Sequence, residues 1–140
     1  MRLSKVLEAL GGSLKKYRND ADPELSGIQM DSRKVKPGDL FVAITGFQID
    51  GHKFIDEAID NGAAAVIGEN ELNLAVPYIQ VFDSRLALGR AASAFYQHPS
   101  RKHTVIGITG TNGKTTVSYI LKHILERSEE HTSELQSPLD

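Results

Sequence analysis

The sequence of 140 residues contains no cysteine, and its formal net charge at pH 7 is only −2. Without cysteine the chain can form neither disulfides nor thiolate metal sites. The nearly balanced charge gives no basic surface for nucleic acid, so we expect no nucleic-acid partner. No apolar run approaches the length of a membrane span. Residues 1–10 include Lys5 and Glu8 within their apolar pattern and so do not form a signal peptide, which predicts a cytoplasmic protein with no membrane partner.

Side-chain arrangements for covalent catalysis are also missing. The five histidines show no metal-ligand spacing, and no Ser/His/Asp or paired-carboxylate arrangement stands out. Internal repeats and low-complexity segments are absent as well. Nothing in the sequence therefore supports catalysis by a side-chain nucleophile.

Residues 103–126, HTVIGITGTNGKTTVSYILKHILE, combine a short apolar run, a glycine-rich loop and a helical pattern. The β-branched run at residues 104–108 predicts a strand buried on both faces. The apolar residues after the loop recur at the spacing of one helix face: they are Val117, Ile120, Leu121, Ile124 and Leu125. A glycine loop that leads into a helix presents unpaired N–H groups and the positive end of the helix dipole, which suits a phosphate.

The loop has the spelling G-x-x-G-K-T, starting at Gly110. The general phosphate-loop pattern G-x-x-x-x-G-K-[ST] requires a glycine where Ile108 stands, so the match departs from the pattern at one position. In a phosphate loop, Lys114 reaches the β- and γ-phosphates and the Thr115 hydroxyl takes a place on Mg²⁺. The alternative is a plain glycine turn. The strand before the loop and the helix after it favour nucleotide binding.

Residues 127–137, RSEEHTSELQS, resemble the in-frame translation of a widely used DNA-sequencing adapter. The alternative is a natural polar helix end, since glutamates are ordinary surface residues. The apolar helix face also stops at Leu125. We therefore expect residues 127–140 to be a non-native tail and residues 1–126 to belong to a longer natural protein.

The chain before the phosphate-loop signal mixes helical and strand patterns. Apolar spacing predicts helices at residues 3–10, 53–61 and 85–96. Apolar runs predict strands at residues 28–30, 40–44, 63–67 and 78–82. Polar residues 13–23 are expected to form a connecting loop. The sequence thus predicts an α/β fold, with a first domain at residues 1–98 and the first strand, loop and helix of a truncated second domain at 99–126.

Two loops of the first domain carry candidate ligand-binding residues. Asp31, Ser32 and Arg33 offer a carboxylate, a hydroxyl and a guanidinium after a strand. Arg33 either binds a phosphate or pairs with Asp31, and periodicity alone favours the second, a structural turn. Residues 46–51 follow the strand at 40–44, where α/β sheets tend to bind ligands. The alternative there is an ordinary loop.

Several blocks of the sequence resemble the Mur ligase family, the cytoplasmic enzymes that build the peptide stem of peptidoglycan. IGITGTNGKTT at 106–116 is similar to the ATP loop of the family. MDSRKVKPGDLFVAITG at 30–46 and DGHKFIDEAIDNGAAAVIGE at 50–69 resemble its N-terminal UDP-sugar-binding domain. FYQHPS at 95–100 resembles the member that adds the third residue of the stem. The resemblance covers essentially all of 1–126, in the order of the family.

Matching positions imply which residues contact which ligand. The substrate-binding residues implied by the resemblance are Met30, Ser32, Phe47, Gln48 and Ile49. Phe47 stands where some members have histidine. The implied ATP-binding residues are Gly110, Thr111, Asn112, Gly113, Lys114, Thr115 and Thr116. Lys114 is the implied catalytic residue on the phosphates, and Thr115 the implied ligand of Mg²⁺.

The resemblance also implies a reaction. ATP phosphorylates the D-glutamate carboxylate of UDP-N-acetylmuramoyl-L-alanyl-D-glutamate, and the amine of a diamino acid attacks the acyl phosphate. The protein then only has to neutralise charge and align the reacting groups, which fits a lysine loop and no nucleophile. Further metal ligands and the domain that selects the amino acid would lie beyond Glu126. We therefore expect an inactive fragment of a monomeric ligase.

Other readings of the same residues are open. The sister ligase that adds D-alanyl-D-alanine has a similar first domain, but it usually has serine where Thr111 stands and lacks the HPS joint. Folylpolyglutamate synthetase shares the ATP loop but has no muramoyl-binding domain before it. A non-catalytic nucleotide-binding module is expected to carry its phosphate loop near the N-terminus and to hold ATP or GTP alone, whereas a ligase fragment binds ATP weakly.

Overall fold

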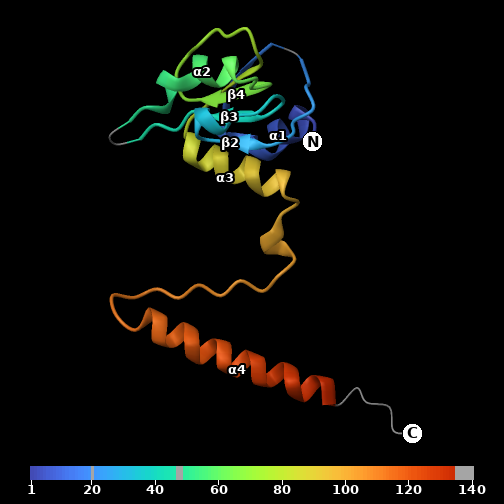
Figure 1. Cartoon of the computed structure of the whole chain (residues 1–140), viewed down its shortest axis with the longest axis vertical. Helices are drawn as coiled ribbons and strands as arrows, with labels where there is room; N and C mark the ends of the chain where they lie inside the picture. Colours follow the sequence, from blue (N-terminus) through green and yellow to red (C-terminus); the bar gives the residue numbers. More distant parts are fainter. Residues whose placement is uncertain (20, 47–48, 135–140) are drawn as a thin grey trace, which may run out of the picture. The chain divides into compact units, whose positions relative to one another are not determined.

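The computed structural model describes residues 1–19, 21–46 and 49–134, with only the helical backbone given for 128–134. The chain forms two compact units, Met1–Lys102 and His103–Asp140. The first unit contains a layered α/β domain, and the second contains a loop and one long helix (Figure 1). The α/β class predicted from the sequence is confirmed.

A five-stranded sheet in the order β1-β5-β4-β3-β2 forms the centre of the first unit. Four of its strands are parallel: β2 (Ile28–Gln29), β3 (Leu40–Val42), β4 (Ala65–Gly68) and β5 (Tyr78–Val81). The edge strand β1 (Leu14–Arg18) is antiparallel to β5. Because four strands run in parallel, the loops that follow them meet at one edge of the sheet, which is the usual ligand-binding edge of α/β folds.

Helices cover both faces of this sheet (Figure 1). Helices α1 (Leu3–Leu10) and α3 (Ser84–Phe95) supply side chains to the cluster on one face, and α2 (Ile55–Asp60) supplies the other. The 3₁₀ turns are Gly11–Ser13, Ser32–Lys34, Gly51–Phe54 and Pro99–Arg101. None of the helices within the described ranges combines the length and apolar character that a membrane span needs.

Successive side chains of the parallel strands point to opposite faces of the sheet and so contribute to the two hydrophobic clusters in turn. In β3, Leu40 and Val42 join the cluster with α1 and α3, whereas Phe41 joins the cluster with α2. The same division occurs along β4 and β5. Strands covered on both faces need apolar residues at successive positions, so they read as continuous apolar runs. This is why the sequence located these strands correctly.

Capping residues define the start of α3 and the end of α2. Asp83 caps α3 through its Oδ1 atom, which accepts hydrogen bonds from the N–H groups of Arg85 at 2.8 Å and Leu86 at 2.9 Å. Gly62 follows α2 with a φ of +98°, and its N–H donates to the Ile59 carbonyl at 2.9 Å. A Cβ on Gly62 would lie 2.8 Å from Pro37 Cα, so both the backbone conformation and the available space require glycine here.

The expectation of a loop over residues 13–23 is wrong, because Leu14–Arg18 forms the edge strand β1. The register against β5 shifts between Leu14 and Lys16, which breaks the alternation that identifies a strand. Only Leu14 and Tyr17 of this strand pack against the core. An edge strand with a bulge and two lysines has no period-two apolar signal, although its lysines do protect the edge from pairing with other chains.

The second unit contains helix α4 (Lys114–Glu134), which begins where the sequence predicted. The strand predicted over residues 104–108 is wrong, because no strand is assigned there. A strand must pair its N–H and C=O groups with a neighbour, and no other strand is described in this unit. Apolar side chains of the unit are accordingly exposed, for example Val105 to 71% and Ile120 to 55%. Helix α4 also continues beyond Leu125 into the segment expected to be a tail.

Candidate ligand-binding sites

A cavity of about 440 Å³ lies in the first unit, at the ends of β2 and β3. Its volume is within the range of small-molecule sites, which is roughly 300–1,000 Å³. The cavity is lined by Met30, Asp31, Ser32, Arg33, Phe41, Ile49, Phe54 and Glu57. The structure thus brings together Met30, Ser32 and Ile49 from the predicted substrate-binding residues. Phe47 and Gln48 lie outside the described residues.

The wall of this cavity is largely apolar. Met30 is 66% exposed and Ile49 is 64% exposed, although both are large hydrophobic residues. Phe41 also lines the cavity but is only 1% exposed, since β3 holds it in the core beside α2. Exposed apolar side chains gathered around a hollow offer a surface that a flat ring can cover.

The turn after β2 is held by a pair of charged side chains. Asp31 Oδ1 accepts from Arg33 Nε and Oδ2 accepts from Arg33 Nη2, both at 2.9 Å. The same carboxylate accepts from the Arg33 N–H at 3.2 Å and caps the 3₁₀ turn. The hydrogen bond from the Arg33 side chain lowers the pKa of Asp31. The interpretation of this segment as a structural turn is confirmed, because the guanidinium fork of Arg33 faces Asp31.

Ser32 is buried to 5% exposure, and its hydroxyl donates to Glu57 Oε2 of α2 at 2.5 Å. Its carbonyl accepts from Asn61 Nδ2 at 3.0 Å. The hydroxyl proton is therefore directed at Glu57, while the hydroxyl oxygen can still accept a hydrogen bond from a ligand. The sequence analysis did not identify Glu57 as a cavity residue. On α2 it is one acidic surface residue among several, and only the folded turn brings it to Ser32.

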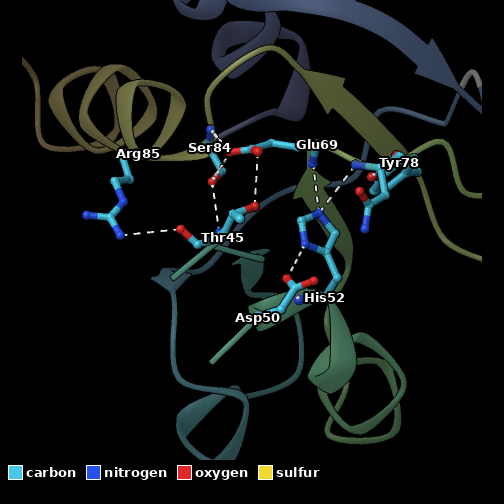
Figure 2. A network of polar contacts seen from close by, with 8 residues as sticks. Thr45, Asp50, His52, Glu69, Tyr78, Ser84 and Arg85 are labelled. Atoms are coloured by element: carbon cyan, nitrogen blue, oxygen red, sulfur yellow. Dashed lines mark hydrogen bonds and ion pairs between the residues drawn. The ribbon is translucent and has the colours of Figure 1, made fainter. Parts of the chain in front are cut away.

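A second polar cluster holds the loop after β3, and Figure 2 shows it from close by. Glu69, at the end of β4, accepts from the Ser84 N–H at 2.8 Å and from the Ser84 hydroxyl at 2.7 Å through Oε1. Its Oε2 accepts from Thr45 Oγ1 at 3.0 Å. The backbone N–H of Glu69 donates to His52 Nε2 at 2.8 Å, and His52 Nδ1 lies 2.6 Å from Asp50 Oδ1. Of these residues, only Asp50 lies in a loop that the sequence indicated as a candidate for ligand binding, residues 46–51.

The hydrogen bonds of this cluster lower the pKa values of its two carboxyl groups. Burial alone would raise the pKa of Glu69, but the hydrogen bonds from Ser84 and Thr45 outweigh burial and lower it below 4.5. Hydrogen bonds from the His52 backbone and then from its ring likewise lower the pKa of Asp50. Both groups therefore favour the carboxylate form in the folded protein.

We predict that Glu69 makes the first unit sensitive to acid. Because the pKa of Glu69 is lower in the folded than in the unfolded chain, its carboxylate stabilises the fold at pH values above 4.5. This stabilisation is lost as the pH falls through the folded value. Thermal unfolding of the wild type and of Glu69→Gln from neutral pH to about pH 3 tests this. The difference in midpoint should shrink as the pH falls, and a difference that grows in acid would contradict it.

The predicted phosphate loop lies at the start of α4. Gly110 and Gly113 have φ values of +149° and +78°, which glycine adopts without strain. Lys114 Nζ donates to the carbonyl of Gly110 at 2.5 Å and to that of Thr111 at 3.4 Å. The ammonium group is thus held over the loop, beside the helix N-terminus where a phosphate would lie. A triphosphate at this helix N-terminus would replace the two loop carbonyls as the partner of the ammonium group.

The donors for a metal ion are less complete than those for a phosphate. Within the described ranges, no group of three His, Asp or Glu side chains could hold a metal. Thr115, the predicted Mg²⁺ ligand, lies exposed in the first turn of α4. A single hydroxyl is one ligand of an octahedral ion that also uses phosphate oxygens and water. A Mg²⁺ ion at Thr115 would therefore have to take its other ligands from a nucleotide and from water.

An α/β domain with a cavity at its strand ends, followed by a Gly-Lys-Thr loop at a helix start, is an arrangement typical of nucleotide-binding α/β proteins. The sequence matches the description "Mur ligase family, catalytic domain" over residues 24–96. The chain belongs to the Mur ligase family. The family predicted from the residues is therefore confirmed.

Curated relatives carry a specific name. A UDP-N-acetylmuramoyl-L-alanyl-D-glutamate–2,6-diaminopimelate ligase from Bacillus velezensis is 43% identical over 133 residues, which is 94% of this chain and 27% of that protein. A ligase of the same name from Listeria monocytogenes is 47% identical over 109 residues, 78% of this chain and 22% of that protein. The chain thus spans about a quarter of the length of these relatives.

Solved structures show the same fold. A UDP-N-acetylmuramoylalanyl-D-glutamyl-2,6-diaminopimelate–D-alanyl-D-alanyl ligase from Acinetobacter baumannii has a TM-score of 0.67 and 31% identity, covering 89% of this chain and 27% of that one. MurF ligase from Thermotoga maritima, solved in complex with ADP, has a TM-score of 0.57 and 39% identity, covering 71% of this chain and 23% of that one. Similarity to these ligases agrees with the predicted fold.

Proposed function

We propose that this chain is the N-terminal part of an ATP-dependent ligase that adds diaminopimelate to UDP-N-acetylmuramoyl-L-alanyl-D-glutamate. The observation that carries the proposal is the cavity after β2 and β3, where Met30, Ser32 and Ile49 meet. Relatives named for this reaction support the choice of substrates. We place the muramoyl-binding domain at residues 1–98 and the start of the ATP-binding domain at 99–126.

The cavity binds the UDP-sugar end of the substrate. Met30 and Ile49 supply the apolar surface for a ring, and they are exposed and free to pack against a ligand. Ser32 offers its hydroxyl oxygen to a donor on the ligand, because its own proton is directed at Glu57. Phe47 and Gln48 belong to the same loop as Ile49 and complete the proposed substrate-binding set.

The phosphate loop binds ATP. The proposed nucleotide-binding residues are Gly110, Thr111, Asn112, Gly113, Lys114, Thr115 and Thr116. Lys114 leaves the loop carbonyls and pairs with the phosphates, and the Thr115 hydroxyl is a ligand of Mg²⁺. ATP supplies the phosphoryl group that activates the D-glutamate carboxylate for attack by the amine of diaminopimelate. The residues of this chain contribute binding and charge neutralisation, which suits a sequence without a candidate nucleophile.

A ligase that adds D-alanyl-D-alanine to the tripeptide is the second candidate. The observation that favours it is the TM-score of 0.67 with the ligase of that kind from Acinetobacter baumannii, compared with 0.58 for a solved UDP-N-acetylmuramoyl-L-alanyl-D-glutamate–2,6-diaminopimelate ligase. The relatives named for diaminopimelate addition are more similar in sequence, at 43% and 47% identity. We therefore retain diaminopimelate addition as the main proposal.

We also propose a cytoplasmic, monomeric enzyme that acts without nucleic acid or membrane. ATP and nucleotide-activated sugars are cytoplasmic metabolites, which supports this location. The mass of the purified protein in solution, measured by light scattering at several concentrations, tests the monomer. A mass that doubles as the concentration rises would contradict it.

Binding of the muramoyl substrate tests the proposal directly. The chain should bind UDP-N-acetylmuramoyl-L-alanyl-D-glutamate in a calorimetric titration, and Met30→Asp should weaken the affinity about 10–100-fold. That factor corresponds to losing the burial of one apolar side chain, about 1.5–3 kcal/mol. Leu86→Asp is the matched control, because Leu86 is also exposed on the same unit but does not line the cavity.

The outcomes of this titration are distinct. Weakening by Met30→Asp with no effect of Leu86→Asp supports the cavity as the UDP-sugar site. Equal effects of both substitutions would show that the UDP-sugar does not bind at Met30. A wild-type chain that binds ATP tightly and the muramoyl dipeptide not at all would favour a nucleotide-binding module instead.

A further inference from the structure

The loop between β3 and the 3₁₀ turn at Gly51–Phe54 is connected near both of its ends to Glu69, the residue after β4 (Figure 2). Thr45 and Asp50 stand at the two ends of this loop and face each other in an isolated antiparallel bridge. The Thr45 hydroxyl donates to the Glu69 carboxylate at 3.0 Å. Asp50 is bonded to the His52 ring, which accepts from the Glu69 backbone N–H at 2.8 Å. Both loop ends therefore depend on Glu69.

The hydrogen bonds of His52 determine its tautomer. A backbone N–H can only donate, so His52 Nε2 accepts from Glu69 and the proton lies on Nδ1, 2.6 Å from Asp50 Oδ1. The side chain of His52 is 6% exposed, so water does not replace these bonds readily. A Cβ on Gly68 would lie 2.8 Å from His52 Nε2, which shows that the end of β4 leaves room for this ring.

The attached loop carries Ile49, which lines the cavity proposed for the UDP-sugar. Within the loop, the Gly46 N–H donates to the Ile49 carbonyl at 3.1 Å, and the Gly51 N–H donates to the Ile44 carbonyl at 2.9 Å. The described part of the loop also bonds with residues outside it: Asp50 bonds with His52, and Thr45 bonds with Glu69, Ser84 and Arg85. None of these partner residues lines the cavity.

We propose that Glu69 and His52 are positioning residues for substrate binding: they hold the two ends of the loop so that Ile49 faces the cavity before the ligand arrives. The inference rests on the proposed function of the cavity. A loop already held in its binding geometry loses less conformational entropy when the ligand binds, so the affinity is higher. Glu69 and His52 act through the loop and do not touch the ligand.

Two substitutions test the two ends of the loop. Thr45→Val keeps the shape of the side chain but removes the hydroxyl, and His52→Leu removes both ring hydrogen bonds. Each should weaken binding of UDP-N-acetylmuramoyl-L-alanyl-D-glutamate about tenfold, the factor that corresponds to one hydrogen bond to a charged group. Thr45→Ser, which restores the hydroxyl, should restore the affinity. Thr45 is exposed, so its variants should fold.

Tyr78→Phe is the matched control. Tyr78 lies beside the same cluster, and its hydroxyl donates to the Asn70 carbonyl at 2.6 Å, but it makes no hydrogen bond to the described residues of the loop. Loss of the Tyr78 hydroxyl should lower the thermal midpoint of unfolding and leave the affinity for UDP-N-acetylmuramoyl-L-alanyl-D-glutamate unchanged. If Thr45→Val and His52→Leu also lower only the midpoint, their role is purely structural and the proposal is overturned.

Amide hydrogen exchange without ligand separates this inference from the proposed function. In Thr45→Val and His52→Leu the amides of Gly46 and Gly51 should exchange about tenfold faster. The Val66 amide, which donates to Pro77 in the sheet, should not change. If the wild type does not bind the muramoyl dipeptide, the proposed function fails while exchange still shows whether Glu69 and His52 hold the loop. Unchanged exchange at Gly46 and Gly51 would overturn the positioning role whatever the ligand is.

Discussion

Replacing Lys114 by alanine in the complete ligase is expected to reduce ATP-dependent ligation by about 10²–10³-fold, the loss typical of removing one group that stabilises developing charge. The Lys114 ammonium already lies over the glycine loop, 2.5 Å from the Gly110 carbonyl, at the N-terminus of α4. Lys114 is the only charged residue among residues 110–116, so it carries the only side-chain charge that the loop offers to the phosphates. Release of ADP with saturating muramoyl dipeptide and diaminopimelate measures the effect.

Lys122→Ala is the matched control for this prediction. Lys122 is a lysine of the same helix and forms an exposed ion pair with Glu126 at 3.6 Å. Exposed pairs contribute about 0–1 kcal/mol, so its loss should leave ligation within a few-fold of the wild type. If Lys114→Ala retained full activity, the loop would not be the ATP site. Equal losses in both variants would point to damage to helix α4.

Replacing Phe41 by alanine is expected to destabilise the first unit by about 3–5 kcal/mol. Phe41 is buried to 1% exposure between β3 and α2, and its truncation leaves a cavity in a core that also contains Val66 and Tyr78. For a unit of about this size, 1 kcal/mol corresponds to a shift of about 4–8 °C, so the thermal midpoint should fall by about 12 °C or more. Thermal unfolding followed by circular dichroism measures the shift.

Phe82→Ala provides the comparison for the same change of side chain. Phe82 follows β5 but is 67% exposed, and Lys15 Nζ lies over its ring, 5.9 Å from the ring centre. Its loss should shift the midpoint by no more than a few degrees. If Phe41→Ala and Phe82→Ala lowered the thermal midpoint equally, Phe41 would not be part of a packed core between α2 and the sheet.

The sequence predicted most of the first unit because its elements carry complete local signals. The strands β3, β4 and β5 are buried on both faces and appear as continuous apolar runs. Helix α3 has an apolar face and the capping residue Asp83. The edge strand β1 was missed because its bulge and its lysines hide the alternation.

For residues 104–108 the error is the reverse of that for β1: a strand was predicted and none forms. The β-branched residues of this segment have a high strand propensity, but propensity supplies no hydrogen-bond partners. Thr104, Ile106 and Ile108 line a cleft of about 410 Å³ beside α4 and do not pair with a strand. Strand formation depends on neighbours that are distant in sequence, so a local pattern cannot establish it.

Some residues of the candidate site could likewise be predicted from the sequence, and others could not. Met30, Ser32 and Ile49 could be predicted because the sequence resembles the Mur ligase family at these positions, whereas the strand pattern alone indicated only candidate loops. Glu57 and Glu69 could not, because each is an acidic residue with an unremarkable local pattern. Their roles depend on the partners Ser32 and Thr45, which are 25 and 24 positions away in the sequence. Tertiary hydrogen bonds of this kind leave no periodic signal.

The most direct test of the account is the reaction of the complete gene product. With Mg²⁺ and ATP, it should release ADP when given UDP-N-acetylmuramoyl-L-alanyl-D-glutamate and diaminopimelate, and removal of Mg²⁺ should stop the release. ADP release only with the muramoyl tripeptide and D-alanyl-D-alanine would establish the second candidate. No ADP release with either pair of substrates would contradict the assignment of this chain to a muramoyl-peptide ligase.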